Sequence, residues 1–149
     1  MRTYVTPDKL HQWTPDIPDT CSKCSNDNGT LYHCLWDCWK IKNYWKSVVQ
    51  IISTIVGTQI PHCATLCILG IYPKDFVVNK KKATLIDFGL LQARRTIALF
   101  WKKVDVPPIK LWILEMASCV ALERLTYITR GRAEEFEDIW RPLEEFIKK

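Results

Sequence analysis

The chain has 149 residues, a formal net charge of +5 and 48% apolar residues, with only 5 glycines. This size and composition predict one folded domain with its own hydrophobic core and exclude disordered and fibrous proteins. An odd number of cysteines, 7, without a secretory leader favours a reducing intracellular compartment, cytoplasmic or nuclear, over a disulfide framework. No apolar run is long enough to span a bilayer, so no membrane contact is expected.

Residues 1–20 are predicted to form a leading helix and a linker. Thr6 followed by Pro7 is an N-cap with proline at the first helical position, so a short helix is expected from Asp8 to Trp13. Pro15 and Pro18 then end this helix and lead into the next segment.

Residues 21–38 contain the sharpest motif of the chain. Cys21, Cys24, His33 and Cys38 follow the spacing C-x2-C-x8-H-x4-C. Three thiols and one imidazole complete the tetrahedron that Zn²⁺ prefers, and the Asn- and Gly-rich segment 25–30 suits a turn that brings the two halves together. The sequence therefore predicts a Cys3His zinc knuckle with Zn²⁺ as cofactor. Because all four ligands come from the protein, the site is expected to be structural rather than catalytic.

Other readings of these residues stay open. The cysteines could be ordinary buried thiols, Cys21 and Cys24 could form a redox pair, and Cys34 could compete with its neighbour His33 as a ligand. His33 is favoured over Cys34 as the fourth ligand, because a site of four thiolates would leave the imidazole without a role. His33 and Cys38 are five residues apart, which is about 140° around an ideal helix. His33 is therefore expected just before the following helix or in a distorted first turn.

Residues 39–149 are predicted to be a helical region. Apolar periodicity and helix-breaking residues predict helices from about 36 to 56, 81 to 103, 109 to 129, and 134 to 148, the last one bent or broken near Pro142. In the connector from 58 to 79, the apolar run 66–69 is too short to assign to helix or strand. The predicted fold class is mainly α: one domain over 1–149, a helical bundle with an N-terminal Cys3His zinc knuckle.

An aromatic and basic cluster directly follows the knuckle. Bases stack on exposed aromatic rings and lysines neutralise phosphates, so the cluster suits a single-strand platform. Tryptophans at helical spacing are more often core, so Trp36 and Trp45 are expected to be buried and Trp39 exposed. The candidate nucleic-acid-binding residues in this segment are Trp39, Lys40, Lys42 and Lys46.

Further basic residues lie on the predicted helix 81–103. Acidic residues gather in the C-terminal segment, so the rest of the chain is basic, which suits a polyanionic partner. Lys81, Arg95 and Lys102 are whole turns apart and could track a phosphate backbone, or they could form an ordinary solvated face. Arg94 could instead pair with a carboxylate within the fold. The candidates here are Lys81, Arg94, Arg95, Lys102 and Lys103.

Several short sequence runs occur in the same order as in a known protein family. They are 4–11 (YVTPDKLH), Cys21-x2-Cys24, 29–33 (GTLYH), 38–45 (CWKIKNYW), 69–70 (LG), 93–98 (ARRTIA) with Trp101-Lys102, 115–117 (EMA), 122–126 (LERLT) and 140–142 (WRP). Over nearly its whole length the chain resembles the C-terminal region of LINE-type (non-LTR) retrotransposon reverse transcriptases of the fish and amphibian kind.

The resemblance implies an α-helical extension that carries a zinc knuckle, with Cys21, Cys24, His33 and Cys38 at the family's ligand positions. It further implies binding of RNA, single-stranded DNA or both, next to a reverse transcriptase core, during target-primed reverse transcription. The gap from Cys24 to His33 is longer than in retroviral knuckles, so guanine readout of their kind is not expected. No Asp-Asp pair stands in a strand–turn–strand context, so the chain is not expected to polymerise DNA by itself. If it is the whole protein, we expect it to be a remnant or a domesticated fragment of the family.

Two other function classes compete with nucleic-acid binding. A protein-interaction module with a structural zinc would show a large exposed apolar patch, on the 48–56 or the 112–120 face, and would aggregate or dimerise. A free-standing enzyme would need an open metal position or a Cys-His nucleophile pair. Outside the predicted zinc site, the adjacent candidate pair is His62-Cys63, and neighbouring side chains point apart on most backbones.

Overall fold

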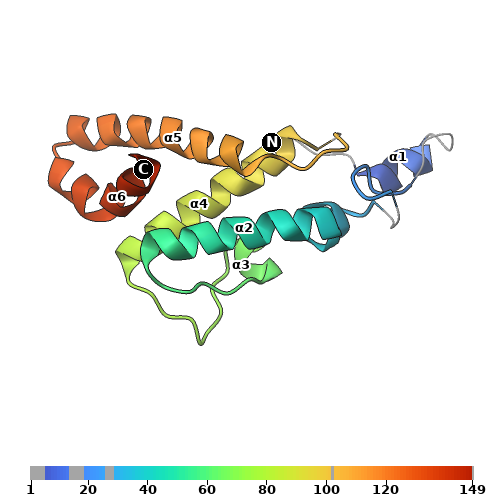
Figure 1. Ribbon diagram of the computed structural model, residues 1–149, viewed down its shortest axis with the longest axis horizontal. Helices are drawn as coiled ribbons and strands as arrows, with labels where there is room; N and C mark the ends of the chain where they lie inside the picture. The colour runs from blue at the N-terminus through green and yellow to red at the C-terminus, as the bar shows by residue number, and fades with distance from the viewer. Residues whose placement is uncertain (1–5, 14–18, 26–28, 102, 149) are drawn as a thin grey trace.

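The computed structural model describes residues 6–13, 19–25, 29–101 and 103–148, and in these residues it contains helices and no β-strand. The predicted mainly α fold is confirmed (Figure 1). Predictions for residues 1–5, for Pro15 and Pro18, for turn residues 26–28 and for Lys102 lie outside the described residues. The elements are α1 (Pro7–Trp13), a π-helical turn η1 (His33–Asp37), α2 (Trp39–Val56), α3 (Ala64–Leu69), α4 (Lys80–Leu99), α5 (Ile109–Thr129) and α6 (Ala133–Lys148).

The core forms where α2, α4 and α5 meet. One face of α2, with Trp45, Val48 and Ile52 at helical spacing, is fully or almost fully buried. Gly89 of α4 lies against this face: a Cβ at that position would come within 2.8 Å of Ile52 Cδ1, so the absent side chain allows the close approach. Trp112 Nε1 of α5 donates a hydrogen bond to the Gly89 carbonyl at 3.0 Å, which ties the third helix to the same crossing.

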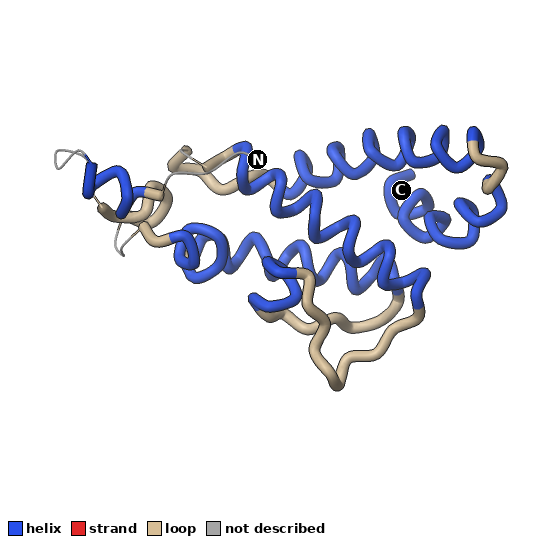
Figure 2. The backbone as a smooth tube through the Cα atoms, turned by 180° about the vertical axis from the view of Figure 1, so that it is seen from behind, coloured by secondary structure: helices blue, strands red, loops and turns tan. Residues whose placement is uncertain are grey.

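Helices α5 and α6 form a hairpin at the end of the molecule that lies opposite α1 (Figures 1 and 2). Helix α5 has the predicted bounds, Ile109–Thr129. Helix α6 continues through Pro142, so of the two predicted alternatives, a bend or a break, the break is wrong. Proline removes one helical hydrogen bond, but Trp140 and Leu143 on either side of it are buried in the core and hold both halves in place.

Helix α4 ends at Leu99, one turn earlier than predicted. The ammonium group of Lys23, far away in the sequence, donates hydrogen bonds to the carbonyls of Phe100 at 2.8 Å and Lys103 at 3.3 Å. These bonds satisfy carbonyl groups just past the helix end, so the chain can leave the helix there. Lys103 therefore lies beyond α4. Of the predicted stripe, Lys81 and Arg95 both belong to α4, whereas Lys102 lies outside the described residues.

The apolar run that the sequence left unassigned belongs to the short helix α3, which Gly70 ends in a left-handed conformation. The loop 70–79 between α3 and α4 extends away from the helices (Figure 2). None of the helices in the described part of the chain is both long and apolar enough to cross a membrane.

Candidate metal centre

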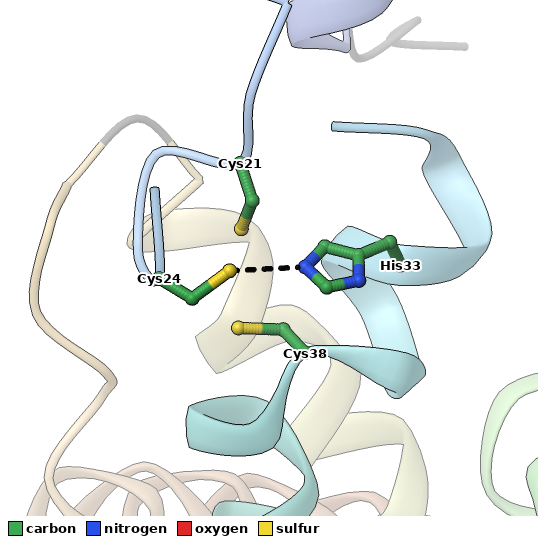
Figure 3. Close-up of side chains that lie close together, drawn as sticks. All are labelled: Cys21, Cys24, His33 and Cys38. Atoms are coloured by element: carbon green, nitrogen blue, oxygen red, sulfur yellow. Dashed lines mark hydrogen bonds between the residues drawn. The ribbon is translucent and has the colours of Figure 1, made fainter. Parts of the chain in front are cut away.

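The side chains of Cys21, Cys24, His33 and Cys38 converge on one point (Figure 3). Their ligand atoms all lie within 4.8 Å of one another. A tetrahedral zinc site with Zn–S bonds of about 2.3 Å places its sulfurs about 3.8 Å apart, so only a small contraction would close the four groups around an ion. Cys21, His33 and Cys38 are buried, and Cys24 is half-buried. The four predicted ligands therefore form a site that can hold a metal ion.

The π-helical turn η1 brings His33 and Cys38 to the same side of the chain, although they are five residues apart. The amide of Cys38 donates to the carbonyl of His33 at 2.9 Å, which closes a turn of five residues instead of four. The wider turn brings residues i and i+5 to the same side, whereas a regular helix would separate them by about 140°. Cys38 then takes an extended conformation (ψ 129°) before α2 begins at Trp39. The distortion expected from the sequence is thus a π turn.

The His33 ring is held from both sides. Its Nε2 atom lies 3.3 Å from Cys24 Sγ and faces the sulfurs, while Nδ1 lies 3.7 Å from Oδ2 of Asp37. Asp37 also contacts Lys42, at 3.6 Å. At 3.7 Å this contact is longer than a hydrogen bond, and a small rotation of the half-exposed Asp37 side chain would bring the carboxylate into the position from which it orients a ligating imidazole. Sequence reasoning missed Asp37, although its position four residues after a predicted ligand was an available signal.

Lys23 connects the two cysteines of the C-x2-C pair to the end of α4. Its side chain is buried, with its ammonium on the carbonyls of Phe100 and Lys103. Burial lowers the pKa of Lys23, and the nearby Cys21 thiol opposes that shift. Three thiolates around a divalent cation leave one net negative charge, which the ammonium of Lys23 would offset. Sequence reasoning missed Lys23 because its partners lie about 80 residues away.

Cys34 is outside the converging group. Its thiol is half-buried and close to Cys21, and burial together with that neighbour raises its pKa to about 12. Burial also raises the pKa of Cys38 to about 11. The Cys38 thiol is therefore protonated at neutral pH in the metal-free protein, and a metal ion must displace that proton.

The tryptophans around the centre are buried or exposed as predicted. Trp36 and Trp45 are buried, and Trp45 Nε1 donates to the Leu35 carbonyl at 2.8 Å. Trp39 is 57% exposed, and Lys40 Nζ lies 5.6 Å from the centre of its ring. Two further rings are exposed: Trp13 at the end of α1, and Tyr32 before η1, which belongs to the aromatic cluster but was not among the candidate binding residues.

Some of the predicted basic residues have partners within the chain, and others are exposed at the surface. Lys81 contacts Asp138 at 3.4 Å, and Arg94 donates to the Ile68 carbonyl at 2.7 Å, a backbone partner rather than the carboxylate that was considered. Lys46 and Arg95 are exposed, and Lys103 Nζ lies 4.5 Å from the Phe100 ring. Lysines 40, 42 and 46 share the N-terminal half of α2 with Trp39, whereas Lys81 lies at the start of α4.

No protein-family model matches the chain.

Proposed function

We propose that the chain is a non-catalytic, zinc-stabilised domain that binds single-stranded nucleic acid, RNA or DNA, and positions it for a polymerase core. This is the role implied by its resemblance to the C-terminal region of LINE-type reverse transcriptases. The observation that carries the proposal is the placement of Trp39: an exposed ring with Lys40 against it, in the residue that directly follows the ligand Cys38.

Zinc is the metal that suits these four ligands best. Thiolate and imidazole are soft or borderline donors, which favour Zn²⁺ over Mg²⁺ and Ca²⁺. With four protein ligands the site has no open position for a substrate, so its role is to fix the chain around it. Cys21, Cys24, His33 and Cys38 would hold the ion and thereby join the turn 19–25, η1 and the residue that precedes α2.

The metal site would also fix the position of the basic and aromatic surface at the start of α2. Because Cys38 is a ligand, the start of α2 is held in place, and the exposed Trp39 ring can accept a base without being ordered first. Base–aromatic stacking contributes about 1–3 kcal/mol per base. Lys40 and the exposed Lys46 are placed to contact phosphates beside the ring. Lys42, Lys81 and Arg94 have partners within the chain and are assigned weaker roles.

The test is a titration of fluorescent single-stranded RNA, single-stranded DNA and duplex DNA at several salt concentrations. Trp39→Ala should weaken single-strand binding about tenfold or more, and Lys46→Ala should reduce the salt dependence by about one phosphate contact. Lys110→Ala, which removes one exposed lysine from α5, is the matched control and should change neither. Binding that ignores both salt and Trp39→Ala would contradict the proposal.

The second candidate is a protein-interaction module with a structural zinc. The apolar faces considered for it are buried: Val48, Ile52 and Val56 on α2 pack in the core, as do Trp112, Met116 and Val120 on α5. The observation that favours this candidate is a different surface, the outer face of α5.

A further inference from the structure

Helix α5 is apolar on two opposite faces, and only one of them is covered. Trp112, Met116 and Val120 pack inward. The opposite face carries four apolar side chains that are each more than half exposed: Leu114 at 54%, Leu122 at 65%, Leu125 at 61% and Ile128 at 51%. Successive positions are eight, three and three residues apart, so they form one stripe along the helix. Both views show α5 along an outer edge of the molecule (Figures 1 and 2).

A groove runs beside this stripe. It has a volume of about 500 Å³, and its walls combine apolar side chains such as Ala117, Ala121 and Ile147 with the charged Arg124, Glu144 and Lys148. Arg124 and Glu144 form an ion pair at 2.6 Å, so their charges offset each other within the wall. Small residues of α5 open the groove, while Leu125, one turn further along, stands at its edge. The same helix therefore presents both a projecting side chain and a recess that could receive one, as in helix pairs where ridges fill grooves.

We propose that this face pairs with the same face of a second copy of the chain, with the two α5 helices antiparallel about a twofold axis at Ala121. Ala117 and Leu125 lie four residues on either side of Ala121, and Leu114 and Ile128 lie seven residues on either side. The axis therefore sets each Ala117 recess opposite the partner's Leu125, and each Leu114 opposite an Ile128. Such self-complementarity is what a twofold interface requires, and a different partner would give no reason for it.

Area and charge agree with this pairing. The stripe and the groove offer on the order of 500 Å² of apolar surface per chain, so the pair would bury about 1,000 Å², at the lower end for specific interfaces. An interface of that size is typical of weak, reversible association. Lys110 lies about three turns from the axis, where crossed helices diverge, and faces the region beyond the end of the partner's α5 at Thr129, so the register brings no like charges of the two helices opposite each other.

The experiment is sedimentation equilibrium of the intact chain from micromolar to millimolar concentration. The wild type should show a monomer–dimer equilibrium, and Leu114→Glu or Ile128→Lys alone should weaken it about tenfold or more, because each buries an unpaired charge. Val77→Glu, a substitution at an apolar side chain that is 85% exposed on the loop 70–79, is the control and should leave the equilibrium unchanged. Circular dichroism of each variant shows whether the helices are intact.

Mixing variants tests the register itself. In the proposed pair, Leu114→Glu of one copy lies opposite Ile128→Lys of the other, so an equimolar mixture should recover dimerisation as a heterodimer. A mixture of Leu114→Glu with Leu122→Lys should not recover it, because Leu122 lies opposite Val120 in this register. A wild type that stays monomeric at millimolar concentration would overturn the proposal and leave the face to a different partner. Failure of the Leu114→Glu and Ile128→Lys mixture to pair would overturn the antiparallel arrangement.

Discussion

Asp37 lies behind the imidazole of His33, with Oδ2 of the carboxylate 3.7 Å from Nδ1 of the ring, while Nε2 on the other side of the ring faces the three sulfurs. Both residues belong to the π-helical turn η1, so one local distortion places the ligand, its supporting carboxylate and the following ligand Cys38. The metal centre is therefore built by a single turn of the chain together with the C-x2-C pair.

Asp37→Asn should lower metal affinity about tenfold to a hundredfold, the usual effect of losing a carboxylate behind a ligating histidine. Competition with a chromophoric chelator measures it. Asp37 also contacts Lys42, so Lys42→Ala is the matched control. If Lys42→Ala weakens metal binding as much as Asp37→Asn does, the carboxylate acts through the lysine and not through His33.

Lys23→Met should destabilise the metal-loaded protein by about 2 kcal/mol or more, because two backbone carbonyls lose a charged donor. The metal-free protein should lose less, since only the loaded centre carries the negative charge that the ammonium of Lys23 offsets. Urea unfolding of both forms, with and without a chelator, measures the difference. Equal losses in the two forms would show that Lys23 acts only as a cap for the end of α4.

Alkaline pH should weaken the fold through Cys67. Burial in α3 raises the pKa of this thiol from its ordinary value of 9.0 to about 12, so the folded state favours the protonated form. The stabilising contribution is complete below pH 9 and is lost as pH rises from 9 towards 12. Urea unfolding at several pH values in that range should therefore show a steeper decline for the wild type than for Cys67→Ala. Parallel declines would exclude this thiol as a source of the pH dependence.

Local patterns in the sequence predicted what depends on neighbours along the chain. The bounds of α5 follow from Pro108 before it and Gly131 after it, and the distorted turn at His33 follows from the angular spacing of two ligands. The structure adds what depends on distant partners. Lys23 donates to the carbonyls of Phe100 and Lys103 just past the end of α4, and Arg94 is occupied by a carbonyl of α3. Periodicity gave no guide to the outer stripe of α5, because that helix is apolar on both faces.

The central claim is that Cys21, Cys24, His33 and Cys38 hold one zinc ion that stabilises the fold. The most direct test measures metal content and helicity of the purified chain beside Cys24→Ser and Cys34→Ser. The account predicts one zinc per chain, lost together with helicity in Cys24→Ser and retained in Cys34→Ser, since Cys34 lies outside the four converging residues. A metal-free wild type with an intact fold, or zinc loss in Cys34→Ser with zinc retained in Cys24→Ser, would contradict it.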